Sequence, residues 1–201
     1  MSDDASEMEP LKIRCSSSHC ASNRHYFRET KKMRENNEPP VCKKCKKDLV
    51  DWDRVRKCDL DDVEHTFEAL KLELVRHSYW HRPFDQRAIN YALRKGRIEL
   101  LRTAESRIRS SVGGPVDAFD GRRTKWEGNP IFYAQHATAA CCRKCIEKWH
   151  GIPRDQPLRE DQIKYLTRLV VMYLGDRLPD LPDHKQKVQR LRRAATGPAR
   201  K

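Results

Sequence analysis

The stretch "QHATAACCRKCIEKWHGIP", residues 135–153, decides the predicted fold of the second half of the chain. We expect a helix over about residues 139–149, because Gly151 and Pro153 are residue types that commonly follow a helix C-terminus. The short apolar run before it, residues 131–134, is typical of a buried strand. The main domain is therefore predicted to be mostly helical with at most a small sheet, an α+β class.

The same stretch concentrates groups that bind soft metal ions. Cys142 and Cys145 lie about one helical turn apart, and His136 and His150 flank the predicted helix. We expect His136, Cys142, Cys145 and His150 to hold a metal ion, with Cys141 as the first substitute. Because basic side chains stand beside these cysteines, a reactive thiol is a second interpretation. Buried cysteines without a metal are the third.

A second set of cysteines stands in the first quarter of the chain. Cys15 and Cys20 form one pair, and Cys42 and Cys45 form another after a segment that can make a hairpin. Two such pairs supply four thiolates to a tetrahedral zinc ion without needing a large core. We therefore predict a small zinc-ribbon-like β module over residues 11–58. The residues able to substitute for one of these four cysteines are His19, His25 and Cys58.

The rest of the chain divides by composition. Residues 1–10 are acidic with few apolar side chains and predict a disordered leader, whereas residues 179–201 are predicted to be a disordered basic tail. Between the ribbon and the tail, residues 59–178 form the predicted helical domain that contains the His/Cys-rich site. A loop rich in glycine and proline interrupts it at residues 111–130. The other helices expected there cover about residues 59–79, 85–96 and 97–112, and a last one begins near Pro157.

The charge balance favours polyanionic partners. The 201 residues include 42 Lys and Arg against 29 Asp and Glu, a formal net charge of +13. We therefore predict a zinc-binding protein that binds nucleic acid through basic surfaces. Lysines beside the second cysteine pair suit phosphate contacts, and a tryptophan beside a lysine suits base stacking. The predicted nucleic-acid contacts are Lys43, Lys44, Lys46, Lys47, Arg122, Arg123, Lys125 and Trp126.

The location of the protein follows from the absence of apolar segments. No run of eighteen apolar residues and no apolar signal region is present, so neither secretion nor a membrane partner is expected. The 8 cysteines then belong to a reducing cytoplasm, where clustered thiols hold metal more often than they form disulfides. One or two zinc ions are the predicted cofactors.

Two alternative functions stay open. The first is a metal-dependent enzyme of the hydrolase or nuclease kind that uses residues 136–150, with Glu147 and Asp120 as the available carboxylates. His136 is followed by alanine and threonine in place of the glutamate of zinc deaminases, so that pattern is excluded. The second alternative is a protein-binding adaptor that uses the exposed face of the helix near residues 61–80.

A resemblance to a known family rests on "DGRRTKWEGNPIFYAQHATAACCRKCIEKWHGIP", residues 120–153. From about Ile89 to Ile152 the chain resembles an uncharacterised bacterial family of small domains with a nearly identical histidine, Cys-Cys-Arg-x-Cys and Trp-His-Gly-Ile-Pro pattern. Ala140 stands where that family is expected to carry threonine. The resemblance implies that residues 120–153 form one recurring site and that the ribbon-like segment is an addition to the family pattern. It implies no activity.

Overall fold

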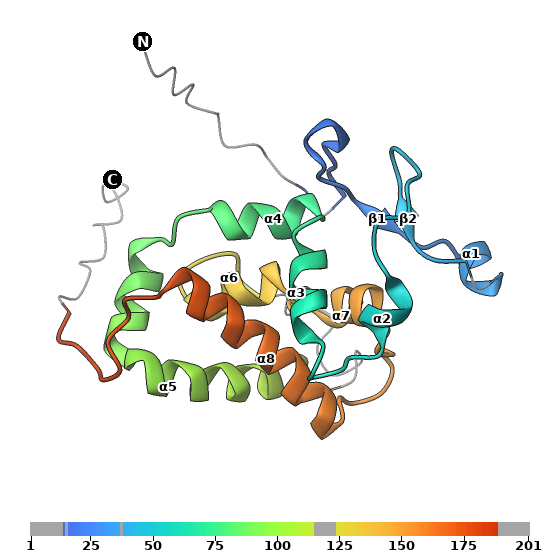
Figure 1. Ribbon diagram of the computed structural model, residues 1–201. Coiled ribbons are helices and arrows are strands. Elements are labelled where there is room, and N and C mark those ends of the chain that lie inside the picture. The colour runs from blue at the N-terminus through green and yellow to red at the C-terminus, as the bar shows by residue number, and fades with distance from the viewer. Residues whose placement is uncertain (1–13, 15, 37, 115–123, 189–201) are drawn as a thin grey trace, which may run out of the picture.

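The computed structural model describes residues 14, 16–36, 38–114 and 124–188, and within them it is mostly helical with one two-stranded sheet (Figure 1). The predicted fold class is confirmed. The elements are the 3-10 turn η1 Cys20–Ser22, β1 Phe27–Arg28, α1 Lys31–Glu35, β2 Val41–Cys42, α2 Trp52–Arg56, α3 Val63–Leu70, α4 Leu74–His81, α5 Gln86–Val112, α6 Pro130–Ala137, α7 Arg143–His150 and α8 Glu160–Arg177.

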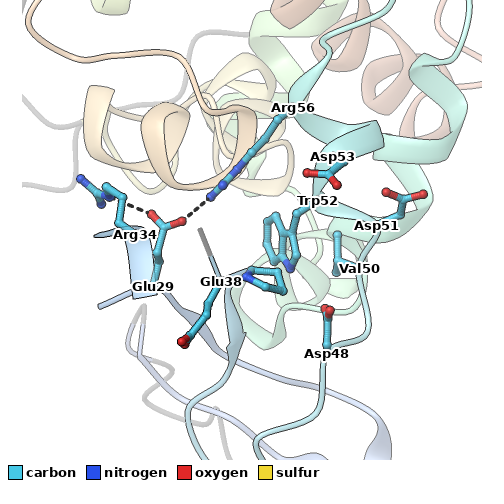
Figure 2. Close-up of a pocket in the computed structure, with 10 residues that line it drawn as sticks. Glu29, Arg34, Glu38, Asp48, Val50, Asp51, Trp52, Asp53 and Arg56 are labelled. Atoms are coloured by element: carbon cyan, nitrogen blue, oxygen red, sulfur yellow. Dashed lines mark hydrogen bonds and ion pairs between the residues drawn. The ribbon is translucent and has the colours of Figure 1, made fainter. Parts of the chain in front are cut away.

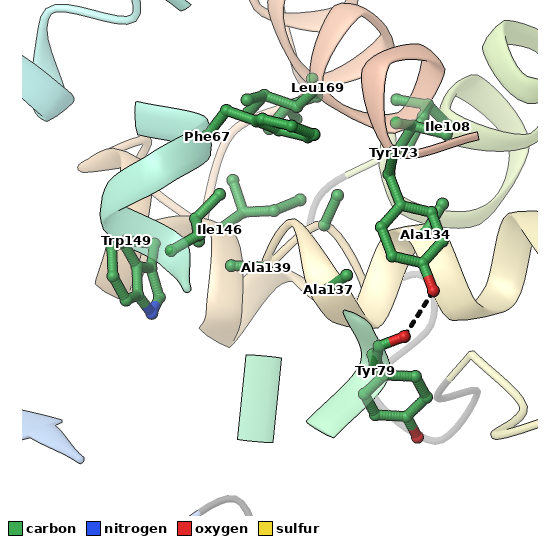
Figure 3. Packing of buried hydrophobic residues seen from close by; sticks show 14 of the residues in the cluster. Phe67, Tyr79, Ile108, Ala134, Ala137, Ala139, Ile146, Trp149, Leu169 and Tyr173 are labelled. Carbon is green, nitrogen blue, oxygen red and sulfur yellow. Dashed lines mark hydrogen bonds between the residues drawn. The ribbon is translucent and has the colours of Figure 1, made fainter. Parts of the chain in front are cut away.

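The short helix α6 lies at the centre of the main domain, in contact with α4, α5 and α8. Its alanines, Ala134 and Ala137, are fully buried, as is Ala139 just beyond its end. Small side chains let the surrounding helices approach closely, and larger groups such as Tyr173 fill the space between them (Figure 3). The hydroxyl of Tyr173 donates a 2.6 Å hydrogen bond to the carbonyl of Tyr79, which ties α8 to α4.

The first cysteine-rich segment packs against the main domain. In the antiparallel β1–β2 pair, Phe27 lies opposite Cys42. The Phe27 ring is buried and meets Trp52 and Trp149 edge-on, with ring centroids 5.4 and 5.9 Å apart. Figure 1 shows this sheet at one end of the molecule, beside α2. Phe27 belongs to the same hydrophobic core as the buried residues of α7. The predicted domain boundary between residues 58 and 59 stays a prediction.

The helix predicted over residues 59–79 is in fact two helices, α3 and α4. Glu73 between them has an extended backbone, with φ −85° and ψ 124°. The reason is backbone pairing with a distant segment: His25 N–H donates to Leu72 O at 2.8 Å, and Leu74 N–H donates to His25 O at 2.9 Å. The carbonyl of Leu72 and the N–H of Leu74, which would otherwise form hydrogen bonds within one helix, bond to His25 instead. The amphipathic pattern did not reveal the break because it does not report this contact with a distant segment.

The buried strand predicted at residues 131–134 is wrong, because these residues lie in α6. Its capping signals stand directly before the apolar run: Asn129 accepts a hydrogen bond from Ile131 N–H through its side chain at 2.9 Å, and Pro130 occupies the first turn. Conversely, the last predicted helix is confirmed as α8, whose apolar face is buried.

The two helices predicted over residues 85–96 and 97–112 form the single kinked element α5. Gly96 breaks its helical geometry with φ +70° and ψ 167°. A returning segment of chain packs against this kink, and Arg97 N–H donates to Pro182 O at 2.8 Å. The predicted leader, residues 115–123 of the predicted loop and residues 189–201 of the tail lie outside the described residues. Among the described helices, none is long and apolar enough to cross a membrane.

Replacing Gly96 with alanine is expected to destabilise the protein strongly. An added Cβ would lie 2.5 Å from the carbonyl carbon of His184 and 2.7 Å from Asp183 O, and the backbone there is left-handed. We expect a loss of roughly 2 kcal/mol or more in the free energy of unfolding, measured by urea denaturation. The matched control is Gly175→Ala in α8, where nothing lies within 4 Å of the new Cβ. It should stabilise by about 0.5–1 kcal/mol, and equal effects at both glycines would contradict the packing argument.

Candidate metal centres

The first centre brings together Cys20, His25, Cys42 and Cys45. One ligand atom from each residue lies within 4.8 Å of all the others. The Cys20 and Cys42 sulfurs are 3.7 Å apart, and the Cys45 sulfur is 3.5 Å from His25 Nδ1. Three thiolates and one imidazole in such a group are geometrically suited to hold a metal ion in tetrahedral coordination.

The backbone and side chains around His25 fix the orientation of its ring. Its main chain pairs with Leu72 and Leu74, and its Nε2–H donates to Asn23 Oδ1 at 2.9 Å. Nδ1 is the ring nitrogen that faces the sulfurs. A hydrogen bond on the outer ring nitrogen is the usual way a metal-binding histidine is held in place.

The turn that carries Cys42 and Cys45 favours a thiolate. Burial raises the pKa of Cys42, but backbone hydrogen bonds at Cys45 and Tyr26 and a side-chain hydrogen bond from His25 outweigh it and lower the pKa to about 6. The turn ends at Lys46, whose φ of +63° is left-handed, the conformation for which glycine is the usual residue.

The first centre differs from the favoured four-cysteine set by including His25, one of the three substitutes named from the sequence. Cys15 lies outside the described residues. The other two substitutes have different partners: His19 Nδ1 is 2.8 Å from Ser22 Oγ, and the Cys58 thiol donates to His150 O at 3.3 Å. Sequence spacing therefore located this centre but did not decide its ligands.

The second centre consists of Cys141, Cys142 and Cys145, whose sulfurs all lie within 4.8 Å of one another. The helix α7 begins only after Cys142, which is its N-cap residue, so Cys141 precedes the helix. The delay relative to the predicted start at residue 139 follows from Ala139, whose φ of +56° turns the chain. Cys145 lies in the first turn of α7, where it faces both earlier thiols.

A buried arginine from α4 contacts the second centre. Arg76 is 2% exposed, and its Nη2 donates to the Cys145 sulfur at 3.1 Å. Its Nη1 donates to His136 O at 2.7 Å and lies 3.7 Å from the Cys141 sulfur. The pKa of Cys145 lies well below its ordinary value because Cys141 and then Cys142 hydrogen-bond to its sulfur and Arg76 adds positive charge, against the effect of burial.

A fully buried carboxylate holds this arginine in place. Glu73 Oε2 accepts from Arg76 Nε at 3.0 Å and from Trp149 Nε1 at 2.6 Å. Its other oxygen accepts from the ammonium of Lys148. Sequence reasoning missed both Glu73 and Arg76, since a Glu and an Arg three residues apart in a helical pattern resemble an ordinary surface ion pair.

The histidines predicted as ligands of the second centre are not part of it. His136 Nε2–H is shared between the carbonyls of Thr124 and Lys125 at 3.2 Å, and His150 Nε2–H donates to Thr138 O at 3.1 Å. Burial lowers the pKa of each ring to about 4, so both are neutral near pH 7. Of the predicted set His136, Cys142, Cys145 and His150, the structure brings together Cys142 and Cys145 with the named substitute Cys141, and the two histidines lie outside this group.

The other predicted residues that the structure describes lie outside both cysteine groups. Glu147 lies outside the three-cysteine group and pairs with Arg154 at 3.7 Å. Trp126 is 46% exposed and stacks on the His136 ring at 4.5 Å, next to Lys125. Asp120, Arg122 and Arg123 lie outside the described residues. The four lysines of the first centre, Lys43, Lys44, Lys46 and Lys47, are all exposed.

A pocket of about 360 Å³ opens near the first cysteine-rich segment, around Trp52 (Figure 2). Carboxylates dominate its lining, while its two guanidinium groups, Arg34 and Arg56, both pair with Glu29, at 3.1 and 3.0 Å. Such a lining repels phosphate, so this pocket is no part of a polyanion-binding surface. The other acidic residues in its lining are Glu38, Asp48, Asp51 and Asp53.

Comparison with known families places the second centre in a recurring domain. The family model "Domain of unknown function (DUF4186)" matches residues 64–175. That range contains Glu73, Arg76 and all three cysteines of the second centre. The first centre lies wholly before it. No solved structure matches the chain.

Removing the charge of Glu73 should destabilise the fold far more than removing an exposed one. In Glu73→Gln, two cations lose their buried carboxylate, and we expect the free energy of unfolding to fall by about 3–5 kcal/mol. In the control Glu68→Gln, the carboxylate is 67% exposed and pairs with Lys71, so a change within about 0.5 kcal/mol is expected. Urea denaturation of both variants measures the difference, and similar losses would refute the buried-pair argument.

Replacing Lys46 with glycine should stabilise the first centre. A side chain in the left-handed region costs about 1–2 kcal/mol, partly offset by the greater freedom of glycine in the unfolded chain. We expect Lys46→Gly to be about 1 kcal/mol more stable than Lys46→Ala in thermal or urea unfolding. Both variants lose the same positive charge, so the comparison isolates the backbone. Equal stabilities would show that the turn relaxes without strain.

Proposed function

The chain belongs to the DUF4186 family, whose description assigns no activity, and we propose that this protein binds zinc and holds nucleic acid through the lysines around its first metal centre. The observation that carries the proposal is one turn of chain. It supplies two of the four ligand residues, Cys42 and Cys45, and it displays four exposed lysines beside them.

The donor set of the first centre supports zinc as the ion. Thiolate and imidazole are the soft and borderline ligands that select zinc over magnesium or calcium. Four protein ligands fill a tetrahedral shell, which is typical of a structural ion. A reducing cytoplasm, the predicted location, keeps such thiols available for metal.

The charge and exposure of the turn support a phosphate-binding role. Lys43 and Lys44 lie between the two cysteines, and Lys46 and Lys47 follow them. Ammonium groups act as point charges toward phosphate oxygens and carry no base specificity. The net charge of +13 adds a long-range attraction for any polynucleotide.

Elemental analysis of the purified full-length chain tests the metal part of the proposal. We expect zinc at one or two ions per chain, with one ion lost in Cys42→Ser and none lost in Cys58→Ser. Cys58 is the matched control because its thiol only donates to a backbone carbonyl. A chain purified without zinc, and unable to take it up, would contradict the proposal.

Salt-dependent binding tests the nucleic-acid part. Affinity for a polynucleotide should fall steeply as the salt concentration rises. In the double variant Lys43→Gln, Lys44→Gln, the slope of log affinity against log salt should become less negative by roughly 1–2. The control is Lys164→Gln, Lys185→Gln, which removes two exposed lysines far along the chain from this turn. Equal losses in both variants would assign binding to net charge alone, and salt-independent binding would refute the proposal.

A further inference from the structure

The second centre has three ligands and lacks a fourth among the described residues. No ring nitrogen of His136 or His150 and no carboxylate oxygen of Glu147 lies within 4.8 Å of all three sulfurs. Arg76 contacts two of the sulfurs, but a guanidinium only donates hydrogen bonds and cannot bind a metal ion. Three protein ligands with one free position distinguish catalytic zinc sites from closed structural ones.

Hydrogen bonds fix the framework around the three thiols. Ala140 N–H donates to Gln135 O at 2.8 Å, and the Gln135 side chain donates back to Ala140 O at 3.1 Å. Thr124 Oγ1 donates to Cys141 O at 2.9 Å. A preorganised ligand triangle binds an ion without the cost of ordering the chain.

The buried charges favour a divalent ion. Glu73 contributes one negative charge, and Arg76 and Lys148 contribute two positive charges, so this group carries one excess positive charge. Three thiolates around a divalent cation carry one negative charge and cancel it. A monovalent ion would leave the region negative and a trivalent ion would leave it positive. Buried charge is tolerated only when it is balanced in this way.

We propose that Cys141, Cys142 and Cys145 bind one divalent ion of the zinc class through three thiolates, with the fourth coordination position left to water or a small exogenous ligand. Cys142 and Cys145 are half-buried, so solvent reaches the edge of the triangle, whereas Cys141 is 6% exposed and Arg76 closes the inner side. The two centres then differ in kind: the first is filled by protein ligands, and the second is able to exchange one.

Cobalt substitution of the full chain tests this difference. The metal-free protein is titrated with Co²⁺, and the charge-transfer and visible absorption bands report the number of bound ions and their ligands. We expect two ions in the unmodified chain and one in Cys145→Ala, with Cys58→Ala as the control that keeps both. Azide should then shift the visible bands of the unmodified chain and of Cys58→Ala, and should leave those of Cys145→Ala unchanged.

The test separates this inference from the proposed function. Cys42→Ala removes a ligand of the first centre, and it should lose one cobalt ion while the azide-sensitive bands remain. Circular dichroism of each variant checks that the helices persist. The inference is overturned if Cys145→Ala binds as many ions as the unmodified chain, or if azide leaves every visible band unchanged. Failure of nucleic-acid binding would not affect either result.

Discussion

The carboxylate of Glu73 is the group on which the three-cysteine cluster depends. It is fully buried, and it accepts hydrogen bonds from a guanidinium, an ammonium and an indole, which come from α4 and α7. A buried charge with that many donors is costly to leave unpaired, so α4 and α7 are fixed relative to each other. The three thiols are thereby held against Arg76, on the same side of the molecule as the carboxylate.

The backbone around the same residue also holds the first centre. Leu72 and Leu74, on either side of Glu73, form the two hydrogen bonds that position His25. The side chain of residue 73 therefore organises one cluster while its neighbours in the chain organise the other. Because the residues of the family match begin at 64, a segment outside the matched range docks onto the matched domain at this point.

The sequence predicted the general fold and the position of both clusters, but not the full set of residues that come together in each. Cysteine spacing correctly placed Cys42 near Cys45 and Cys142 near Cys145, because residues three positions apart stay close in space in most backbone conformations. It did not choose His25, because that choice depends on pairing with residues about fifty positions later in the chain. It also assigned His136 and His150 as ligands, whereas their rings turn toward backbone carbonyls that only the tertiary structure brings near.

The relation between the two centres follows from their different surroundings. In the first centre His25 and Cys42 are buried and Cys20 and Cys45 are half-buried, and a bound ion would tie together a segment that contains only short helices and strands. The second centre lies against a packed helical core, and Trp149 and Ile146 of the same helix, α7, are fully buried. If the three-cysteine group binds an ion, its fourth position stays open to exchange, which makes this group the better candidate for chemistry.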